Sequence, residues 1–218
     1  STVYYGYHHK GLARKRPVAP ERDEPFICGL LGRIGGTKGH DLVLEAAQKL
    51  SHIGCRSFRF VFIGEAPTPE DGKEWRDRVK QKGLGELIEF RGYREDIGAE
   101  LARVHLLLIP SRAEPFGRIL CEAAEARCPV LLSDSGGLGE LSHRFDIGVR
   151  HRPRDVQSFT EQLLFIRDHY DKVSAQFETA AQRLLTALDF EEYMARIETI
   201  LARCAAGESV SLQWFGVD

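Results

Sequence analysis

Two kinds of apolar pattern alternate along this chain. Short unbroken apolar runs are typical of strands that are buried on both faces of a sheet. They occupy residues 26–31, 58–63, 87–90, 104–109, 130–133 and, more weakly, 147–149. Between these runs, apolar residues recur at helical spacing, first at Leu42, Val43, Ala46, Ala47, Leu50 and Ile53. Because strands alternate with helices, we predict an α/β fold, a Rossmann-like doubly wound parallel sheet of about six strands with helices on both faces.

The remaining helical segments and the composition of the first residues predict three parts of the chain. Helices are predicted at 71–82, at 97–103, from near Pro115 to Cys128 and, beyond Pro153, to about Cys204. The residues before the first strand mix prolines with a basic cluster, which is typical of an extended, solvated connector. We therefore expect a hinge or linker at 1–25, a Rossmann-like domain at 26–188, and a C-terminal helix and tail at 189–218.

The topology of such a sheet makes two of its loops important. In the common strand order 3-2-1-4-5-6, the first and fourth strands are neighbours at the topological switch point, where ligands bind beyond the carboxyl ends of the strands. The loops that follow those two strands are then expected to face each other across one crevice. They are also the two most unusual loops of the sequence.

The loop after the first strand is rich in glycine and carries two cations. It runs from Gly32 to Gly39 and contains Arg33, Gly35, Gly36 and Lys38. Glycines allow a close backbone approach, and the cations before a helix start are suited to phosphate. Thr37 stands where the P-loop motif requires glycine, and the dinucleotide motif GxGxxG is absent. The alternative is a glycine-rich turn with solvated charges.

The loop after the fourth strand leads into a helix and places two carboxylates at the same sheet edge. Glu114 stands at the turn, and Glu122 lies on the second helical turn among apolar neighbours. Paired carboxylates are consistent with glycoside hydrolysis. Opposite a phosphate site, however, they are better suited to accept hydrogen bonds from ribose or sugar hydroxyls. A solvated helix residue is the alternative for Glu122, although an unpaired charge in that setting is costly.

At this point the sequence resembles a known family, the C-terminal donor-binding domain of the family-four retaining glycosyltransferases of GT-B fold. The resemblance extends from about Val3 to Ile200. It depends on the segments GRIGGTKGHDLVLEAA, FVFIGE, RGY, LLLIPSRAEPFGRILCEAAEARCPVLLSDSGGLGE and DFEEYMARI. The opening TVYYGYHH resembles the interdomain hinge of the family, with Tyr5 where asparagine is common.

The resemblance implies a role for each site residue. Arg33 and Lys38 hold the donor diphosphate and stabilise it as leaving group, and Glu114 holds the donor sugar; these three are the expected catalytic residues. Glu122 holds the ribose hydroxyls. The remaining expected donor-binding residues are Gly35 and Gly36 in the first loop, Phe116, Gly117 and Arg118 through their backbone N–H groups, and Tyr93 and Arg94 near the base.

Composition narrows the class of protein further. The 218 residues carry a formal net charge of −2, which argues against a bulk nucleic-acid binder. The five cysteines form no CxxC pair, so we expect reduced thiols in a cytoplasmic protein, with neither a zinc site nor disulfides. The basic cluster Arg14, Lys15, Arg16 and Arg22 fits a peripheral contact with a membrane as well as a solvated linker. His40 and His105 are expected to be structural.

These observations give one leading functional hypothesis and two rivals. We expect a domain that binds a UDP- or GDP-linked sugar for a hexosyltransferase, with no required metal or other cofactor, because no Asp-x-Asp motif is present to hold a metal–diphosphate complex. The chain reads as a piece of a longer protein, since the acceptor-binding domain of the family would precede Val3. Alone, it should bind donor without appreciable transfer. The rivals are a sugar-nucleotide epimerase of the same fold and a non-catalytic nucleotide-binding module.

Overall fold

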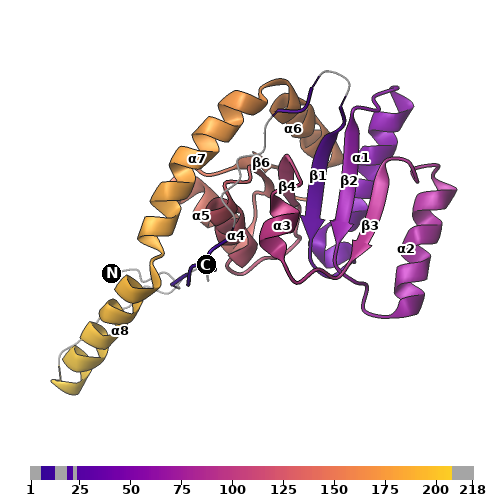
Figure 1. Cartoon of the computed structure of the whole chain (residues 1–218). Coiled ribbons are helices and arrows are strands. Elements are labelled where there is room, and N and C mark those ends of the chain that lie inside the picture. Colours follow the sequence, from indigo (N-terminus) through magenta and orange to yellow (C-terminus); the bar gives the residue numbers. More distant parts are fainter. Residues whose placement is uncertain (1–5, 13–18, 22–23, 208–218) are drawn as a thin grey trace.

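A computed structural model describes residues 6–12, 19–21 and 24–207. Its centre is a parallel sheet in the order β3-β2-β1-β4-β5-β6, which confirms the predicted topology (Figure 1). The strands are β1 (Phe26–Leu31), β2 (Phe58–Ile63), β3 (Ile88–Gly92), β4 (Leu106–Ile109), β5 (Val130–Ser133) and β6 (Val149–His151). Phe26 pairs with Phe58 and Cys28 with Leu106, so β1 is bonded on both edges.

Helices cover both faces of this sheet. They are α1 (His40–His52), preceded by the 3-10 turn η1 (Gly36–Lys38), α2 (Pro69–Gln81), α3 (Ile97–Leu101), α4 (Arg118–Ala126), α5 (Gly136–Phe145), α6 (Val156–Asp168), α7 (Tyr170–Ala187) and α8 (Phe190–Ala205). One apolar cluster joins the sheet to α1, α2 and α6, and the other joins it to α3, α4, α5 and α7. In β4, Leu106 and Leu108 face the first cluster and Leu107 faces the second, as alternation along a strand requires.

The structure corrects two sequence-based boundaries. The helix that was predicted to open near Pro115 begins at Arg118, because Gly117 adopts a left-handed conformation with φ 80°. A Cβ at Gly137 would lie 2.0 Å from the carbonyl oxygen of Pro115, so the start of α5 presses on this loop and keeps it outside the helix. The weak sixth strand begins at Val149 instead of Ile147, since Gly148, at φ 76°, belongs to the preceding turn.

One helix was not anticipated from the sequence. Helix α5 begins with the sequence GGLGEL, in which three glycines interrupt the helical spacing of apolar residues. Leu138 and Leu141 nevertheless lie buried in the core. Gly139 is required by space, because a Cβ there would lie 2.9 Å from Asp134 Oδ1. The same close packing that hides the helix in the sequence fixes it against the loop after β5.

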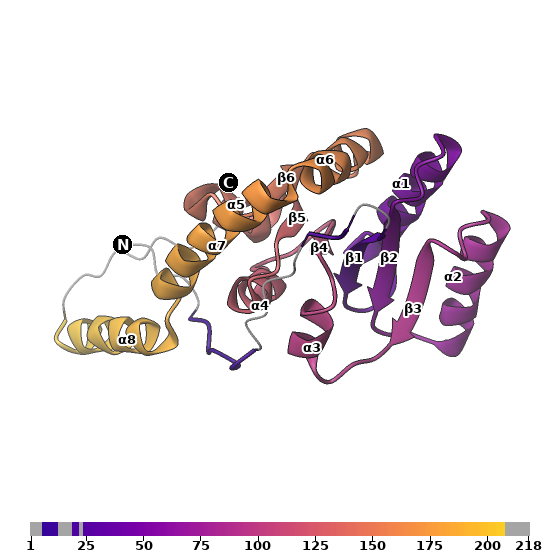
Figure 2. The same ribbon diagram turned by 45° about the horizontal axis from the view of Figure 1, so that its top comes forward.

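The beginning of the described chain meets the junction between α7 and α8 beside α4. The backbone N–H of Tyr7 donates to the carbonyl oxygen of Leu188 over 2.6 Å, and Tyr7 forms an isolated bridge with Asp189. Helix α8 projects from this corner away from the sheet (Figures 1 and 2). The basic cluster Arg14, Lys15, Arg16 and Arg22 lies outside the described residues. Within those residues, no helix combines the length and apolar character needed to cross a membrane.

Candidate functional site

The loops after β1 and β4 meet at the switch point, as the sequence predicted. The backbone N–H of Arg112 donates to the carbonyl oxygen of Thr37 over 3.0 Å. Lys38 Nζ lies 2.7 Å from Glu114 Oε2, and these side chains are 34% and 16% exposed. The hydrogen bond and ion pair fix two polar loops against each other at the carboxyl ends of neighbouring strands.

The glycine-rich loop has a shape that side chains would prevent. Gly39 has φ 80°, and a Cβ there would lie 2.3 Å from the carbonyl oxygen of Pro110. The Arg112 guanidinium lies beside Gly36, 3.7 Å from where a Cβ would stand, and Arg112 is paired with Asp41. The loop backbone therefore approaches the opposite loop closely, with cationic side chains at its margin.

His40 braces this loop from beneath. The side chain is fully buried, and its Nδ1 lies 3.1 Å from the carbonyl oxygen of Gly35. Burial lowers the pKa of His40 to about 4, although the carbonyl of Gly35 acts in the opposite direction. The imidazole is therefore neutral near pH 7, and its Nδ1 lies within hydrogen-bond distance of both the carbonyl oxygen and the N–H of Gly35, the second at 3.3 Å. This geometry agrees with the structural role expected for His40.

Arg33 differs from Lys38 in its surroundings. It is exposed, and no hydrogen bond or ion pair joins it to any other residue that the structure describes. A cation at the rim with its donors free can turn toward an anion without breaking an internal contact. The two predicted phosphate ligands thus lie in one loop, but only Lys38 is already engaged.

Helix α4 begins at the second loop and brings a carboxylate back to the same edge. Gly117 is the N-cap, and the exposed Arg118 is the first helical residue. The first backbone N–H groups of a helix have no acceptor within it, so Phe116, Gly117 and Arg118 stand where an anion can be bound. Glu122 lies one turn further along and is only 9% exposed.

Sequence reasoning missed the partner of Glu122. Lys10, in the segment before the first strand, forms an ion pair with Glu122 Oε1. The neighbouring acid Glu125 is 3% exposed and accepts from the hydroxyl of Tyr7 over 2.8 Å. It also accepts from the backbone N–H groups of Lys10, Gly11 and Leu12 over 3.1, 2.8 and 3.2 Å. A contact over more than a hundred residues of sequence leaves no local pattern that could have predicted it.

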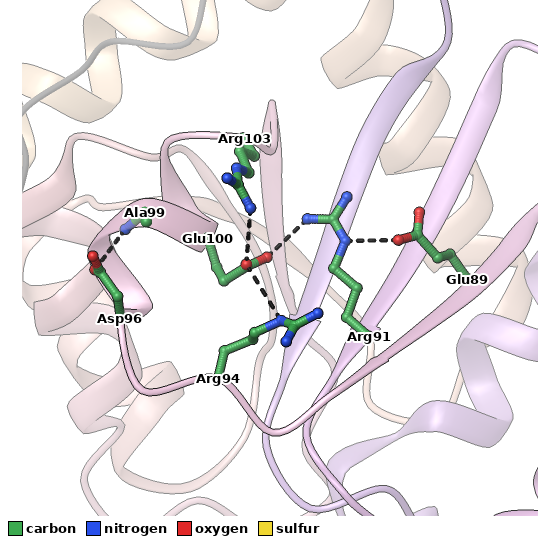
Figure 3. Close-up of polar contacts among 7 residues, drawn as sticks. All are labelled: Glu89, Arg91, Arg94, Asp96, Ala99, Glu100 and Arg103. Atoms are coloured by element: carbon green, nitrogen blue, oxygen red, sulfur yellow. Dashed lines mark hydrogen bonds and ion pairs between the residues drawn. The ribbon is translucent and has the colours of Figure 1, made fainter.

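The predicted base-side residues lie at the carboxyl end of β3. Tyr93 is 64% exposed, and Arg94 Nε lies 3.7 Å from Glu100 Oε1 (Figure 3). Glu100, on α3, is almost fully buried and also accepts from Arg91 over 2.8 Å and from Arg103 over 3.3 Å. The hydrogen bond from Arg91 to Glu89, with the bond to Glu100, holds the pKa of Arg91 above its ordinary value against the effect of partial burial.

This arginine cluster was not foreseen from the sequence. Its hub, Glu100, follows the helix cap Asp96 and reads as an ordinary surface glutamate of a short helix. In the structure it pairs with Arg91 of β3, Arg94 of the following turn and Arg103 just after α3 (Figure 3). No contact among the described residues joins Tyr93 or Arg94 to Lys38 or Glu114, since β2 lies between β3 and β1. The two groups share only the carboxyl edge of the sheet.

The described residues offer no cluster of metal ligands. Among the described residues, no group of three or more His, Cys, Asp or Glu side chains has the arrangement needed to hold a metal ion. The positive groups at the switch point are protein cations and helix starts. Arg33, Lys38 and the beginning of α4 are features of the described switch point that can receive an anion.

Comparison with known proteins assigns the chain to a class. The family model "Glycosyl transferases group 1" matches residues 13–183, and the chain belongs to this family. The match covers both switch-point loops and the turn after β3. It confirms the family resemblance that the sequence motifs predicted.

Three proteins show how far the similarity extends. Glycogen synthase of Mycobacterium tuberculosis is 31% identical over 203 residues, which are 90% of this chain and 47% of that protein. The C-terminal domain of LpcC, a glycosyl transferase group 1 family protein of Francisella tularensis, has a TM-score of 0.63 and 27% identity, over 84% of this chain and 94% of that one. HepE of Anabaena in complex with UDP has a TM-score of 0.74 and 24% identity, over 82% and 49%. The chain spans about half the length of the curated relatives it matches.

Proposed function

We propose that this chain is the nucleotide-sugar donor site of a hexosyltransferase, and that the site acts without a metal. The observation that carries the proposal is the contact between Lys38 Nζ and Glu114 Oε2, 2.7 Å apart at the switch point. A cation and a carboxylate held side by side can bind the groups on either side of the bond between diphosphate and sugar. The cation binds the diphosphate, and the carboxylate binds the hydroxyls of the attached sugar.

The chemistry follows from that placement. Transfer breaks the bond between the anomeric carbon of the sugar and the diphosphate oxygen, and the electron pair stays on the diphosphate. An acceptor hydroxyl forms the new bond to that carbon and releases its proton to the departing diphosphate. Lys38 and Arg33 stabilise the developing charge, together with the N–H groups of Phe116, Gly117 and Arg118, as preorganised electrostatic groups do in other enzymes. Glu114 orients the sugar. Retention of anomeric configuration is part of the proposal and is supported by the family alone.

The rest of the site binds the nucleoside. Glu122 accepts hydrogen bonds from the ribose hydroxyls, and the turn at Tyr93 and Arg94 lies beside the base. Gly35 and Gly36 allow the diphosphate to approach the loop backbone. The HepE structures in complex with UDP and with UDP-glucose favour a UDP-linked donor over a GDP-linked one.

The acceptor is proposed to bind to another domain. The chain spans about half of its curated relatives, and glycosyl transfer requires donor and acceptor to be held in attack geometry, which can contribute about 7–11 kcal/mol to the barrier reduction. We therefore expect this chain to bind donor but not to transfer it. Attachment of an acceptor-binding domain before Val3 should produce transfer of the sugar, whereas formation of an epimerised nucleotide sugar would contradict the proposal.

Calorimetry with UDP, UMP and UDP-glucose in the presence of a chelator tests the donor site. Lys38→Met should weaken UDP about ten- to a hundredfold but UMP little, because it removes a charge-assisted bond to the second phosphate worth roughly 1.5–3 kcal/mol. Glu114→Gln should weaken UDP-glucose more than UDP. Lys73→Met, an exposed lysine paired with Asp77 on α2, is the matched control. An unchanged ratio of UDP to UMP affinity in Lys38→Met would place the phosphates elsewhere, and binding only with added magnesium would refute the metal-free account.

A further inference from the structure

We propose that Lys10 is a positioning residue of the donor site, which holds one oxygen of Glu122 so that the other is presented to the ribose. This inference rests on the proposed function. It extends the site from the Rossmann-like domain into the segment that precedes the first strand. Lys10 acts through Glu122 and need not touch the donor.

The surroundings of Glu122 make a fixed counter-ion necessary. Its side chain is only 11% exposed, on a helix whose neighbouring positions Cys121 and Ala123 are fully buried. A carboxylate in such a setting is costly unless a charge or hydrogen-bond donors accompany it. Lys10 Nζ supplies the charge at Oε1. Among the described residues, none donates a hydrogen bond to Oε2, so this oxygen is left for a ligand.

Lys10 is held in place by the next acid on the helix. Glu125 lies three residues after Glu122, so the two side chains project from one face of α4. Glu125 accepts from the backbone N–H groups of Lys10, Gly11 and Leu12, and Gly11 has φ 66°, a left-handed conformation that lets successive amides converge on one carboxylate. The backbone of Lys10 is thereby fixed, and its side chain reaches one helical turn back to Glu122.

The anchoring continues on the other side of the segment. The Tyr7 hydroxyl donates to Glu125 over 2.8 Å, and the Tyr7 N–H donates to the Leu188 carbonyl over 2.6 Å. Tyr7 is buried in the same apolar cluster as α4 and α7. A lysine on a free tail would lose considerable conformational freedom on pairing. Here the hydrogen bonds to Glu125 and Leu188 already order most of the backbone around Lys10. The arrangement therefore holds a single charge at one defined carboxylate oxygen.

The consequence for binding is specific to the ribose. An ionised carboxylate accepts hydrogen bonds only, and the two ribose hydroxyls are donors. With Oε1 held by Lys10, the carboxylate keeps its orientation when the nucleotide enters. Loss of the lysine should leave Glu122 free to rotate, which weakens its bond to the ribose without altering the diphosphate site.

Calorimetric titration of the whole chain with UDP and with 2′,3′-dideoxyuridine 5′-diphosphate tests this. Lys10→Met should weaken UDP about three- to thirtyfold, as expected for residues of one network, and leave the dideoxy nucleotide within about twofold. Lys10→Arg should restore most of the UDP affinity. Lys73→Met on α2 should change the affinity for neither nucleotide.

A double-mutant cycle completes the test. If Lys10 acts through Glu122, Lys10→Met combined with Glu122→Gln should bind UDP no more weakly than Glu122→Gln alone. Tighter UDP binding by Lys10→Met would show that the lysine competes with the ribose, and equal losses for both nucleotides would show a general charge effect; either result overturns the inference. Failure of the proposed function looks different, because the unaltered chain would then bind neither nucleotide or would not prefer UDP to its dideoxy form.

Discussion

Helix α4 carries two buried carboxylates one turn apart, and the structure satisfies them in opposite ways. Glu125 receives four hydrogen bonds from uncharged donors, the Tyr7 hydroxyl and the N–H groups of Lys10, Gly11 and Leu12. Within the described part of the chain, Glu122 receives one hydrogen bond, from the charged Lys10. The first carboxylate has its acceptor capacity filled within the chain, and the second keeps part of it. Two glutamates of similar burial can therefore have different tasks, one in the fold and one at a ligand.

The largest effect that this comparison predicts is on stability. Glu125→Ala should lower the free energy of unfolding by about 2–4 kcal/mol, because it leaves buried donors without an acceptor. Glu122→Ala should cost less than about 1 kcal/mol, since Lys10 is 39% exposed and can return to water. Urea denaturation followed by circular dichroism measures both. Equal losses in the two variants would remove the distinction between them.

A third buried carboxylate gives the next effect. Glu100 is as buried as Glu125 but its partners are charged: Arg91, Arg94 and Arg103. Arg94 and Arg103 are 50% and 66% exposed, so water can replace much of what they lose. Glu100→Gln should cost about 1–3 kcal/mol of unfolding free energy, chiefly through the mostly buried Arg91. Glu89→Gln, which removes a more exposed partner of the same arginine, is the control and should cost under about 1 kcal/mol.

The two acids of α4 should also be separable by pH. Burial raises the pKa of Glu125, but the hydrogen bonds from Lys10 N–H, the Tyr7 hydroxyl and the other amides outweigh it, and the pKa lies below its ordinary value. A carboxyl whose pKa is lower in the folded than in the unfolded chain stabilises the fold fully above its unfolded pKa. That stabilisation is lost as pH falls through the folded pKa. The stability difference between the parent and Glu125→Gln should accordingly shrink in acid, and a difference independent of pH would contradict this assignment.

The sequence foretold the sheet and the switch point because both depend on local patterns. Apolar runs mark β1 and β4, and the topology then brings Lys38 and Glu114 together. The start of α4 could not be predicted in the same way, because it is set by a contact with Gly137, a residue of another helix.

The partners of the buried glutamates could not be predicted from the sequence either. Lys10 is separated from Glu122 by 112 positions, and nothing in the neighbourhood of either residue indicates the other. Helix α5 was not predicted because its first turns carry glycines, which close packing requires, in place of apolar residues at helical spacing. Patterns within one helix or strand could thus be predicted from the sequence, whereas contacts between elements far apart in the sequence could not.

The smallest effect isolates a single donor of the Glu125 site. Tyr7→Phe keeps the ring in the apolar cluster and removes only the hydroxyl, whose pKa is held above its ordinary value by burial and by the neighbouring Glu125. The loss should be about 0.5–1.5 kcal/mol, the usual net contribution of one hydrogen bond, because three backbone N–H groups still satisfy the carboxylate. In Glu125→Gln the same tyrosine change should cost less, since the two residues are then no longer coupled through the charge. If Tyr7→Phe cost as much as Glu125→Ala, the tyrosine would be the anchor of the segment and the backbone donors secondary. If it also weakened UDP binding as strongly as Lys10→Met, the position of Lys10 would depend on this hydroxyl more than on the three amides.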